Sequence, residues 1–145
     1  MRYPPGHKQA ARQRLLDTAA RVVKKEGFAA TGLADLMASA GVTTGAFYTQ
    51  FRSRSELLGA IVERDLARLN AAYGRATARE LRRLLRRYLS IAHVEHPEDG
   101  CPLPSLAAEI ARADEPTREA FETLLVEQRD LLTAILGGET PAWAA

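Results

Sequence analysis

Apolar residues recur at spacings of three and four along almost the entire chain, and no segment shows the strict alternation typical of a strand. The first run comprises Leu15, Leu16, Ala19, Val22 and Val23. Further runs lie within residues 33–40, 42–51, 57–69, 81–89, 105–113 and 121–135, and Gly27, Gly41 and Pro116 separate some of them. The pattern predicts an all-α fold of about seven helices and no sheet, with a loop at residues 93–104.

The composition is that of an ordinary globular protein. The chain has 145 residues, 46% hydrophobic and 26% charged, enough for one domain of ordinary size or two small ones. The single cysteine, Cys101, excludes an internal disulfide and a thiolate-rich zinc site. The longest charge-free stretch, residues 36–51, is rich in Thr, Ser and Gly, and the first residues lack the apolar core of a signal peptide. We therefore expect a cytoplasmic protein with no membrane partner.

Charge is distributed unevenly along the chain. Residues 1–64 hold ten Lys and Arg against five Asp and Glu, and residues 65–94 hold seven against two. Residues 95–145 hold three against eleven. Such a pattern indicates that one end of the molecule meets a polyanion, and scattered solvating charge is the alternative.

Two short predicted helices meet at Gly41, with a longer helix on either side. This spacing fits a helix-turn-helix, in which glycine permits the turn and the second helix enters the major groove of DNA. On that second helix, Phe47 and Phe51 share one face and are expected to pack inward. The residues left facing outward are Thr43, Thr44, Gly45 and Tyr48. An ordinary helical hairpin with a polar outer face is the alternative.

Three segments resemble one known family, the TetR family of bacterial transcriptional regulators. They are Thr31-Gly32-Leu33-Ala34-Asp35-Leu36, Ala40-Gly41-Val42-Thr43-Thr44-Gly45-Ala46-Phe47-Tyr48, and Phe51-Arg52-Ser53-Arg54-Ser55-Glu56-Leu57-Leu58. The resemblance covers roughly residues 8–64. It implies a helix-turn-helix DNA-binding domain at residues 1–52, followed by the first turn of a connecting helix. Residues 53–145 would form a helical regulatory domain that binds ligand and dimerises, here shortened.

The resemblance also implies which residues meet DNA. Thr43, Thr44 and Gly45 fall where family members meet bases, and Tyr48, Gln50 and Arg54 where they meet phosphates. Arg52 offers a further cation beside them, and Lys8 and Arg12 are candidates for phosphate contact at the start of the first helix. Gly45 has no side chain to read a base, so DNA shape would contribute to specificity.

The resemblance implies a homodimeric repressor that a small-molecule effector releases from double-stranded operator DNA. Family members usually continue with one or two more long helices that form the dimer. We therefore expect Leu132, Ile135 and Leu136 to be exposed, or dimerisation through another surface. The expected lining of the effector site is Leu85, Tyr88, Leu89, Cys101, Leu106, Phe121 and Leu125, each of which can equally be plain core. Cys101 resembles a reactive sensor cysteine with a lowered pKa at a helix start, or is a quiet packed side chain.

Other functional classes find little support. The chain has no catalytic triad, phosphate-binding glycine loop or paired catalytic carboxylates, so no enzyme is expected, and no cofactor. The spacing of His93, His96 and Cys101 matches no standard zinc pattern, so no metal is expected. Five arginines within residues 79–87 are expected to face solvent and pair with the acidic C-terminal segment. The alternative function is a helical protein-interaction module whose helix-turn-helix does not bind DNA.

Overall fold

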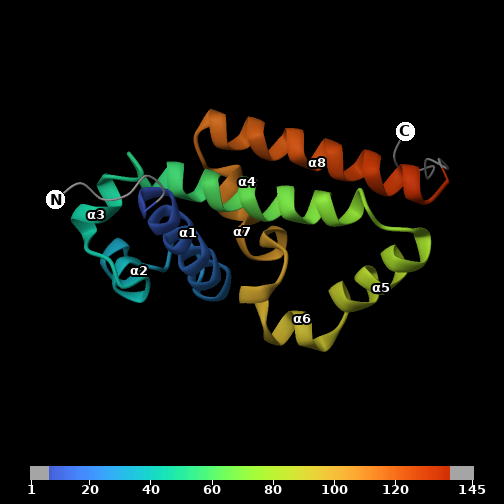
Figure 1. Ribbon diagram of the computed structural model, residues 1–145, viewed down its shortest axis with the longest axis horizontal. Coiled ribbons are helices and arrows are strands. Elements are labelled where there is room, and N and C mark those ends of the chain that lie inside the picture. The colour runs from blue at the N-terminus through green and yellow to red at the C-terminus, as the bar shows by residue number, and fades with distance from the viewer. Residues whose placement is uncertain (1–6, 138–145) are drawn as a thin grey trace.

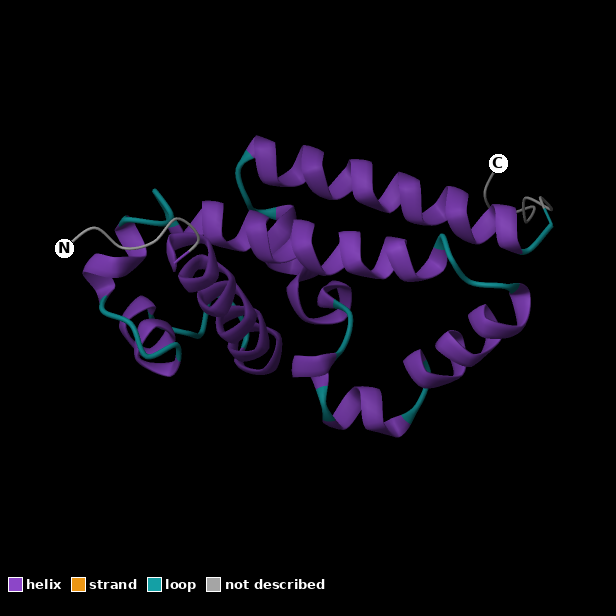
Figure 2. Cartoon of the chain, in the orientation of Figure 1, coloured by secondary structure: helices purple, strands orange, loops and turns teal. Residues whose placement is uncertain are grey.

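The computed structural model describes residues 7–137, in which every regular element is a helix (Figures 1 and 2). The elements are α1 (His7–Glu26), α2 (Leu33–Ser39), α3 (Thr44–Tyr48), α4 (Arg54–Tyr73), α5 (Ala78–Tyr88), α6 (Ile91–Glu95), the 3-10 turn η1 (Pro97–Asp99), α7 (Pro102–Ala111) and α8 (Glu115–Ile135). The predicted all-helical fold is confirmed. No described helix is long and apolar enough to cross a bilayer.

Glycine and side-chain caps set the ends of the first helices. Gly27 ends α1 with φ of +88°, and Gly41 makes the turn between α2 and α3 with φ of +67°, a region that other residues rarely adopt. The hydroxyl of Thr43 accepts a hydrogen bond from the Ala46 amide and caps α3. The hydroxyl of Ser53 does the same for Glu56 at the start of α4. The carboxylate of Glu56 accepts from the Arg52 amide, one residue before the N-cap amide that a standard capping box would engage.

One hydrophobic core joins the N-terminal helices to the rest of the chain. Its fully buried members include Val23 of α1, Phe47 of α3, Leu66 of α4 and Ile110 of α7. The first half of α4 contributes to the same cluster, so buried contacts continue across the boundary expected at residues 52 and 53. The boundary expected between the two domains therefore does not coincide with a gap in packing.

The C-terminal half is built on two long helices. α4 and α8 lie side by side over most of their length, and α5, α6 and α7 form an arch along another side of α4 (Figure 1). At the α4–α8 contact, the buried Asn70 donates to the carbonyl of Leu124 and to the carboxylate of Glu127. This arrangement leaves α5 supported mainly at Leu81, which is fully buried.

The loop expected at residues 93–104 is only partly present. The structure places His93 within α6, residues 97–99 in η1 and the start of α7 at Pro102. Proline is well suited to the first turn of a helix because its missing amide hydrogen has no intrahelical partner there. Pro97 and Pro102 therefore begin helical turns within the expected loop.

Candidate functional site

The short helix α3 presents its polar side chains outward. Thr43, Thr44 and Gly45 are exposed, and the side chain of Tyr48 is 62% exposed. Phe47 and Phe51 are buried behind them. The predicted orientation of this helix is therefore confirmed, and the backbone at Gly45 is open because a Cβ there would meet only the Thr43 hydroxyl at 3.8 Å.

Aromatic packing holds α3 against the rest of the N-terminal helices. The rings of Phe47 and Phe51 stack with their centroids 5.7 Å apart. The guanidinium of Arg12 lies 4.6 Å from the centroid of the Phe51 ring, a cation–π contact that places this α1 side chain beside α3. Arg52 is exposed and Gln50 half-buried at the end of α3. The side chain of Lys8, the other expected phosphate contact on α1, lies outside the described residues.

Arg54 has a different environment from the one expected. Its Nη2 donates to the carbonyl of Phe28 at 2.6 Å and to the carbonyl of Thr31 at 2.8 Å, and its guanidinium lies 4.9 Å from the Phe28 ring centroid. These contacts connect the start of α4 to the α1–α2 loop. The two hydrogen bonds use only Nη2, so the side chain positions the helix-turn-helix, and the phosphate contact expected of Arg54 stays a prediction.

A buried ionic cluster connects α1 to α4. Asp65 accepts from Lys24 Nζ at 2.9 Å and from Arg64 Nη2 at 2.6 Å, and Arg64 Nη1 also reaches Asp17 at 2.6 Å. The side chains of Lys24 and Asp65 are only 7% and 9% exposed. Lys24 further donates to the carbonyl of Gly100 at 3.0 Å. Lysine is seldom buried, but here the segment between η1 and α7 covers Lys24 and its ammonium has two partners.

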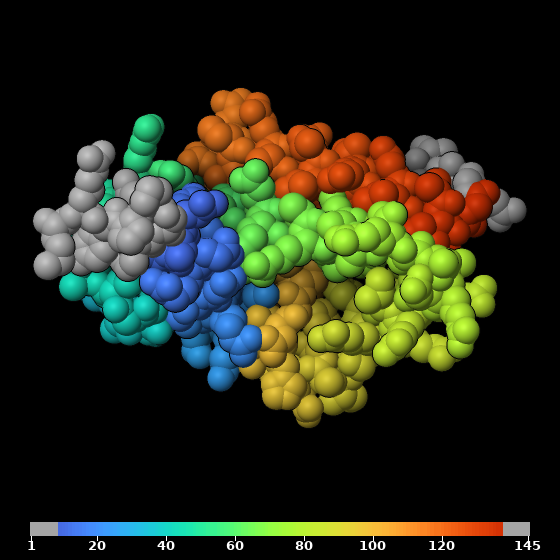
Figure 3. Space-filling view, in the orientation of Figure 1, coloured from blue at the N-terminus to red at the C-terminus, as the bar shows by residue number. Residues whose placement is uncertain are grey.

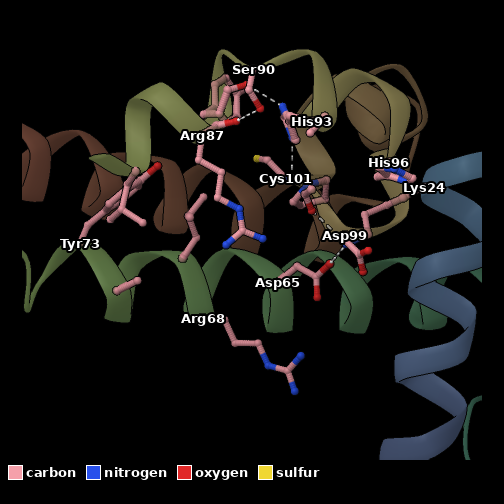
Figure 4. A pocket seen from close by; sticks show the side chains of 17 residues that line it. Lys24, Asp65, Arg68, Tyr73, Arg87, Ser90, His93, His96, Asp99 and Cys101 are labelled. Atoms are coloured by element: carbon pink, nitrogen blue, oxygen red, sulfur yellow. Dashed lines mark hydrogen bonds and ion pairs between the residues drawn. The ribbon is translucent and has the colours of Figure 1, made fainter. Parts of the chain in front are cut away.

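A pocket of about 490 Å³ opens between α4, α5, α6 and the η1–α7 segment. Figure 3 shows the surface hollowed where α4 and α5 face the α6–α7 segment, and Figure 4 shows the lining side chains. Tyr88 and Cys101 line this pocket, as expected for a ligand site. The other expected lining residues do not: Leu106 is fully buried in the core, Leu89 is 81% exposed, and Leu85, Phe121 and Leu125 lie outside the lining.

Cys101 lies in a setting that disfavours its thiolate. Burial raises the pKa of its thiol, and this outweighs the lowering by the Leu103 amide and by Lys24. The lowered pKa expected for a residue at a helix start is therefore not found, although Cys101 does occupy the N-cap of α7. The reason is that desolvation of the charged form exceeds the stabilisation offered by nearby donors.

We expect Cys101 to react slowly with a thiol reagent such as DTNB at pH 7.5, and faster in the chain unfolded by guanidinium. The pKa of the Cys101 thiol is higher in the folded chain than its ordinary value of 9.0, so the folded state holds this proton more tightly than the unfolded state does. The resulting contribution to stability is fully present below pH 9.0 and is lost as the pH rises through the pKa of the folded chain. Absorbance at several pH values measures the labelling rate. Labelling of the folded chain faster than the unfolded chain at pH 7.5 would contradict this assignment.

His93 organises the pocket wall rather than a metal site. Its Nε2 accepts from the Cys101 amide at 3.3 Å, so its Nδ1 carries the proton and donates to the Tyr88 carbonyl at 2.8 Å. Both ring nitrogens are therefore engaged. Among residues 7–137 no group of three or more His, Cys, Asp or Glu side chains has the arrangement to hold a metal ion.

The arginines of α5 do not make the contacts expected of them. The ion pairs within the described residues connect α1 with α4, α1 with η1, and neighbouring positions in sequence, and none connects α5 with the acidic α8. The solvent-facing part of the prediction holds, because Arg79, Arg82, Arg83, Arg86 and Arg87 are all exposed.

The N-terminal helices have the architecture of helix-turn-helix regulators: two short helices joined at a left-handed glycine, with the second presented outward. The family model described as "Bacterial regulatory proteins, tetR family" matches residues 15–61. Over this N-terminal segment the chain is therefore similar to the TetR family of bacterial regulators. Over 55 residues it is 40% identical to the HTH-type transcriptional regulator AcrR of Shigella flexneri, a match that covers 38% of this chain and 26% of AcrR. It therefore spans about a quarter of that regulator's length.

Solved structures extend the similarity beyond the N-terminal helices. The reduced form of E. coli NemR has a TM-score of 0.71 and 25% identity, over 88% of this chain and 69% of NemR. The TetR family transcriptional regulator PfmR from Thermus thermophilus has a TM-score of 0.66 and 23% identity, over 91% of this chain and 73% of PfmR. Both AcrR and PfmR are transcriptional regulators rather than enzymes.

Proposed function

We propose that this chain is a DNA-binding transcriptional repressor that inserts α3 into the major groove and is released from its operator by a small molecule. The observation that carries the proposal is the outward presentation of Thr44 and Tyr48 on a helix anchored from behind by Phe47 and Phe51. A short helix with small polar side chains can approach the groove floor closely. A threonine there offers a hydroxyl to a base edge and a methyl to thymine.

The proposed contacts divide into two kinds. Thr43, Thr44 and the open backbone at Gly45 meet bases, and the exposed Tyr48 and Arg52 meet phosphates. The remaining proposed phosphate contacts are Gln50, Arg12 and Lys8. Arg12 packs on the Phe51 ring just after α3, which supports its assignment to the neighbourhood of this face. Arg54 holds the loop behind the recognition helix through Nη2, and it remains a further proposed phosphate contact through its other guanidinium nitrogens.

The function is tested by binding to the DNA upstream of the chain's own coding region. We expect affinity to fall more than about tenfold between 50 and 200 mM salt, because phosphate contacts release condensed counterions. Fluorescence anisotropy with labelled duplex measures this. Absent or salt-insensitive binding would refute the repressor and favour a helical protein-interaction module.

Two recognition helices about one DNA turn apart read a palindrome, so the proposed repressor acts as a homodimer. The exposed side of α8 supports this, because its other side packs on α4 while Val126 is 41% exposed and Leu136, at the C-cap of the helix, is 65% exposed. Leu132 and Ile135, also expected to be exposed, are half-buried. Size-exclusion chromatography with light scattering tests the assembly, and a monomer at high concentration would contradict it.

We expect two substitutions in α3 to have different signatures on DNA. Tyr48→Phe should lower affinity for all sequences by about fivefold, since one hydrogen bond to a phosphate is lost. Thr44→Val should change the preference among operator variants by about 1–3 kcal/mol. The control is Arg83→Gln in α5, an exposed residue outside the pocket lining, which should leave DNA affinity unchanged. If Tyr48→Phe lowered the free energy of unfolding by as much as it lowered the free energy of DNA binding, the role of Tyr48 would be structural instead.

A further inference from the structure

The charges that line the pocket are unequally matched. Asp65 is neutralised by Lys24 and Arg64, and Asp99 by Arg21. Within residues 7–137 no carboxylate lies within ion-pair distance of Arg87, whose guanidinium points into the pocket in Figure 4. Arg68 also borders the pocket, but Figure 4 shows its side chain directed away from it. Arg87 is exposed overall, so the pocket offers one cation at its solvent-facing side that no described carboxylate neutralises.

The pocket supplies a second donor and an apolar wall. Tyr73 is 6% exposed, and its hydroxyl makes no hydrogen bond to the described residues although it borders the pocket. Burial raises the pKa of this phenol, so it keeps its proton near neutral pH and can donate. The apolar part of the lining comes from Leu69, Ala72, Leu84 and Pro102.

We propose that this pocket binds an amphipathic monocarboxylate, with its anionic head at Arg87 and Tyr73 and its hydrocarbon or aromatic part along the α4 wall. A carboxylate only accepts hydrogen bonds, which suits a guanidinium and a protonated phenol, and the planar guanidinium can bind both of its oxygens. A cavity of about 490 Å³ is large enough for a molecule of drug size. A cationic ligand is disfavoured because both carboxylates at the pocket already have basic partners.

The test uses sets of probes with the same skeleton and different head groups. 4-Phenylbutyrate, 4-phenylbutan-1-ol and 4-phenylbutylamine differ in charge but little in shape, and octanoate with octan-1-ol forms a second set. Isothermal titration calorimetry on the full chain without DNA measures binding. We expect at least one acid to bind, at least about tenfold more tightly than its alcohol, and the amine not to bind. Equal affinity of acid and alcohol, binding of the amine, or binding of neither acid would overturn the proposal.

Substitutions locate the anionic head. Arg87→Gln should weaken binding of the acid about tenfold and leave the alcohol unchanged, and Tyr73→Phe should weaken the acid severalfold while keeping the buried ring. The matched control is Arg83→Gln, an exposed arginine of the same helix that does not border the pocket, which should bind the acid as the parent chain does. Thermal unfolding shows that each variant is folded. Equal affinities of the Arg87 and Arg83 variants would overturn the assignment of Arg87.

The proposed ligand class depends on the proposed function in one respect: it treats this pocket as the site where the effector of the repressor binds. Binding of acids is measured without DNA, and binding of DNA without acids. A chain that binds its operator but none of the acids would refute only the ligand class. One that binds an acid but no DNA would refute only the repressor.

Discussion

Replacing Phe47 with alanine is expected to lower the free energy of unfolding by about 3–5 kcal/mol, the range for removing a fully buried aromatic ring. The Phe47 ring is 0% exposed and stacks on Phe51 in the core that α1, α2 and α4 share. α3 has only five residues, too few to be stable alone, so tertiary packing holds it in place. Loss of this anchor should also abolish DNA binding. Urea denaturation followed by circular dichroism measures the change in stability.

The adjacent residue provides the control for this substitution. Tyr48→Ala removes a ring of similar size that is 62% exposed, so stability should change by about 0.5 kcal/mol or less. Its DNA affinity should nevertheless fall, because Tyr48 is a proposed phosphate contact. Similar unfolding midpoints for the two alanine variants would refute the inward placement of Phe47, on which the proposed recognition surface depends.

Asp65→Asn is expected to cost about 3–5 kcal/mol, since it removes the carboxylate between two basic side chains. Lys24 and Arg64 approach Asp65 within 2.9 and 2.6 Å, and their side chains are 7% and 13% exposed. Without the carboxylate, two poorly solvated cations face each other between α1 and α4. Urea denaturation measures the loss, and the thermal midpoint should fall with it.

Two companion variants separate burial from charge. Asp130→Asn breaks an exposed pair with Arg129 at 2.7 Å, which should change stability by about 1 kcal/mol or less because both groups are solvated. Lys24→Met should cost less than Asp65→Asn, since Asp65 keeps Arg64 as its partner. A cost for Asp65→Asn no larger than that for Asp130→Asn would show that the cluster is not effectively buried.

The recognition surface was predictable because its determinants are local. Gly41 makes the turn through its own backbone freedom, and the spacing of Phe47 and Phe51 identifies the inward face of α3. Arg54 shows the limit of that reasoning. The same motif that predicts a phosphate contact does not reveal that the carbonyls of Phe28 and Thr31, more than twenty residues earlier in the chain, engage its guanidinium.

The pocket was less predictable than the recognition surface. Apolar character marks Leu89 and Leu106 alike, yet one is exposed on the arch and the other lies in the core. Charged side chains at the pocket, such as Arg87, carry no periodic signal that separates them from solvent-facing arginines. For the ionic cluster, the available sequence signal was a charged residue, Asp65, directly beside a buried position, Leu66.

Residue order is sufficient to specify helices, caps and turns because these depend on interactions among near neighbours, a few residues apart. It also specifies the inward face of each helix, since that face follows from helical periodicity. The burial of Lys24, the engagement of Arg54 and the lining of the pocket depend on contacts between residues 23 to 76 positions apart in the chain. These follow from how the helices pack, because packing determines which charges lose water and which side chains border a cavity.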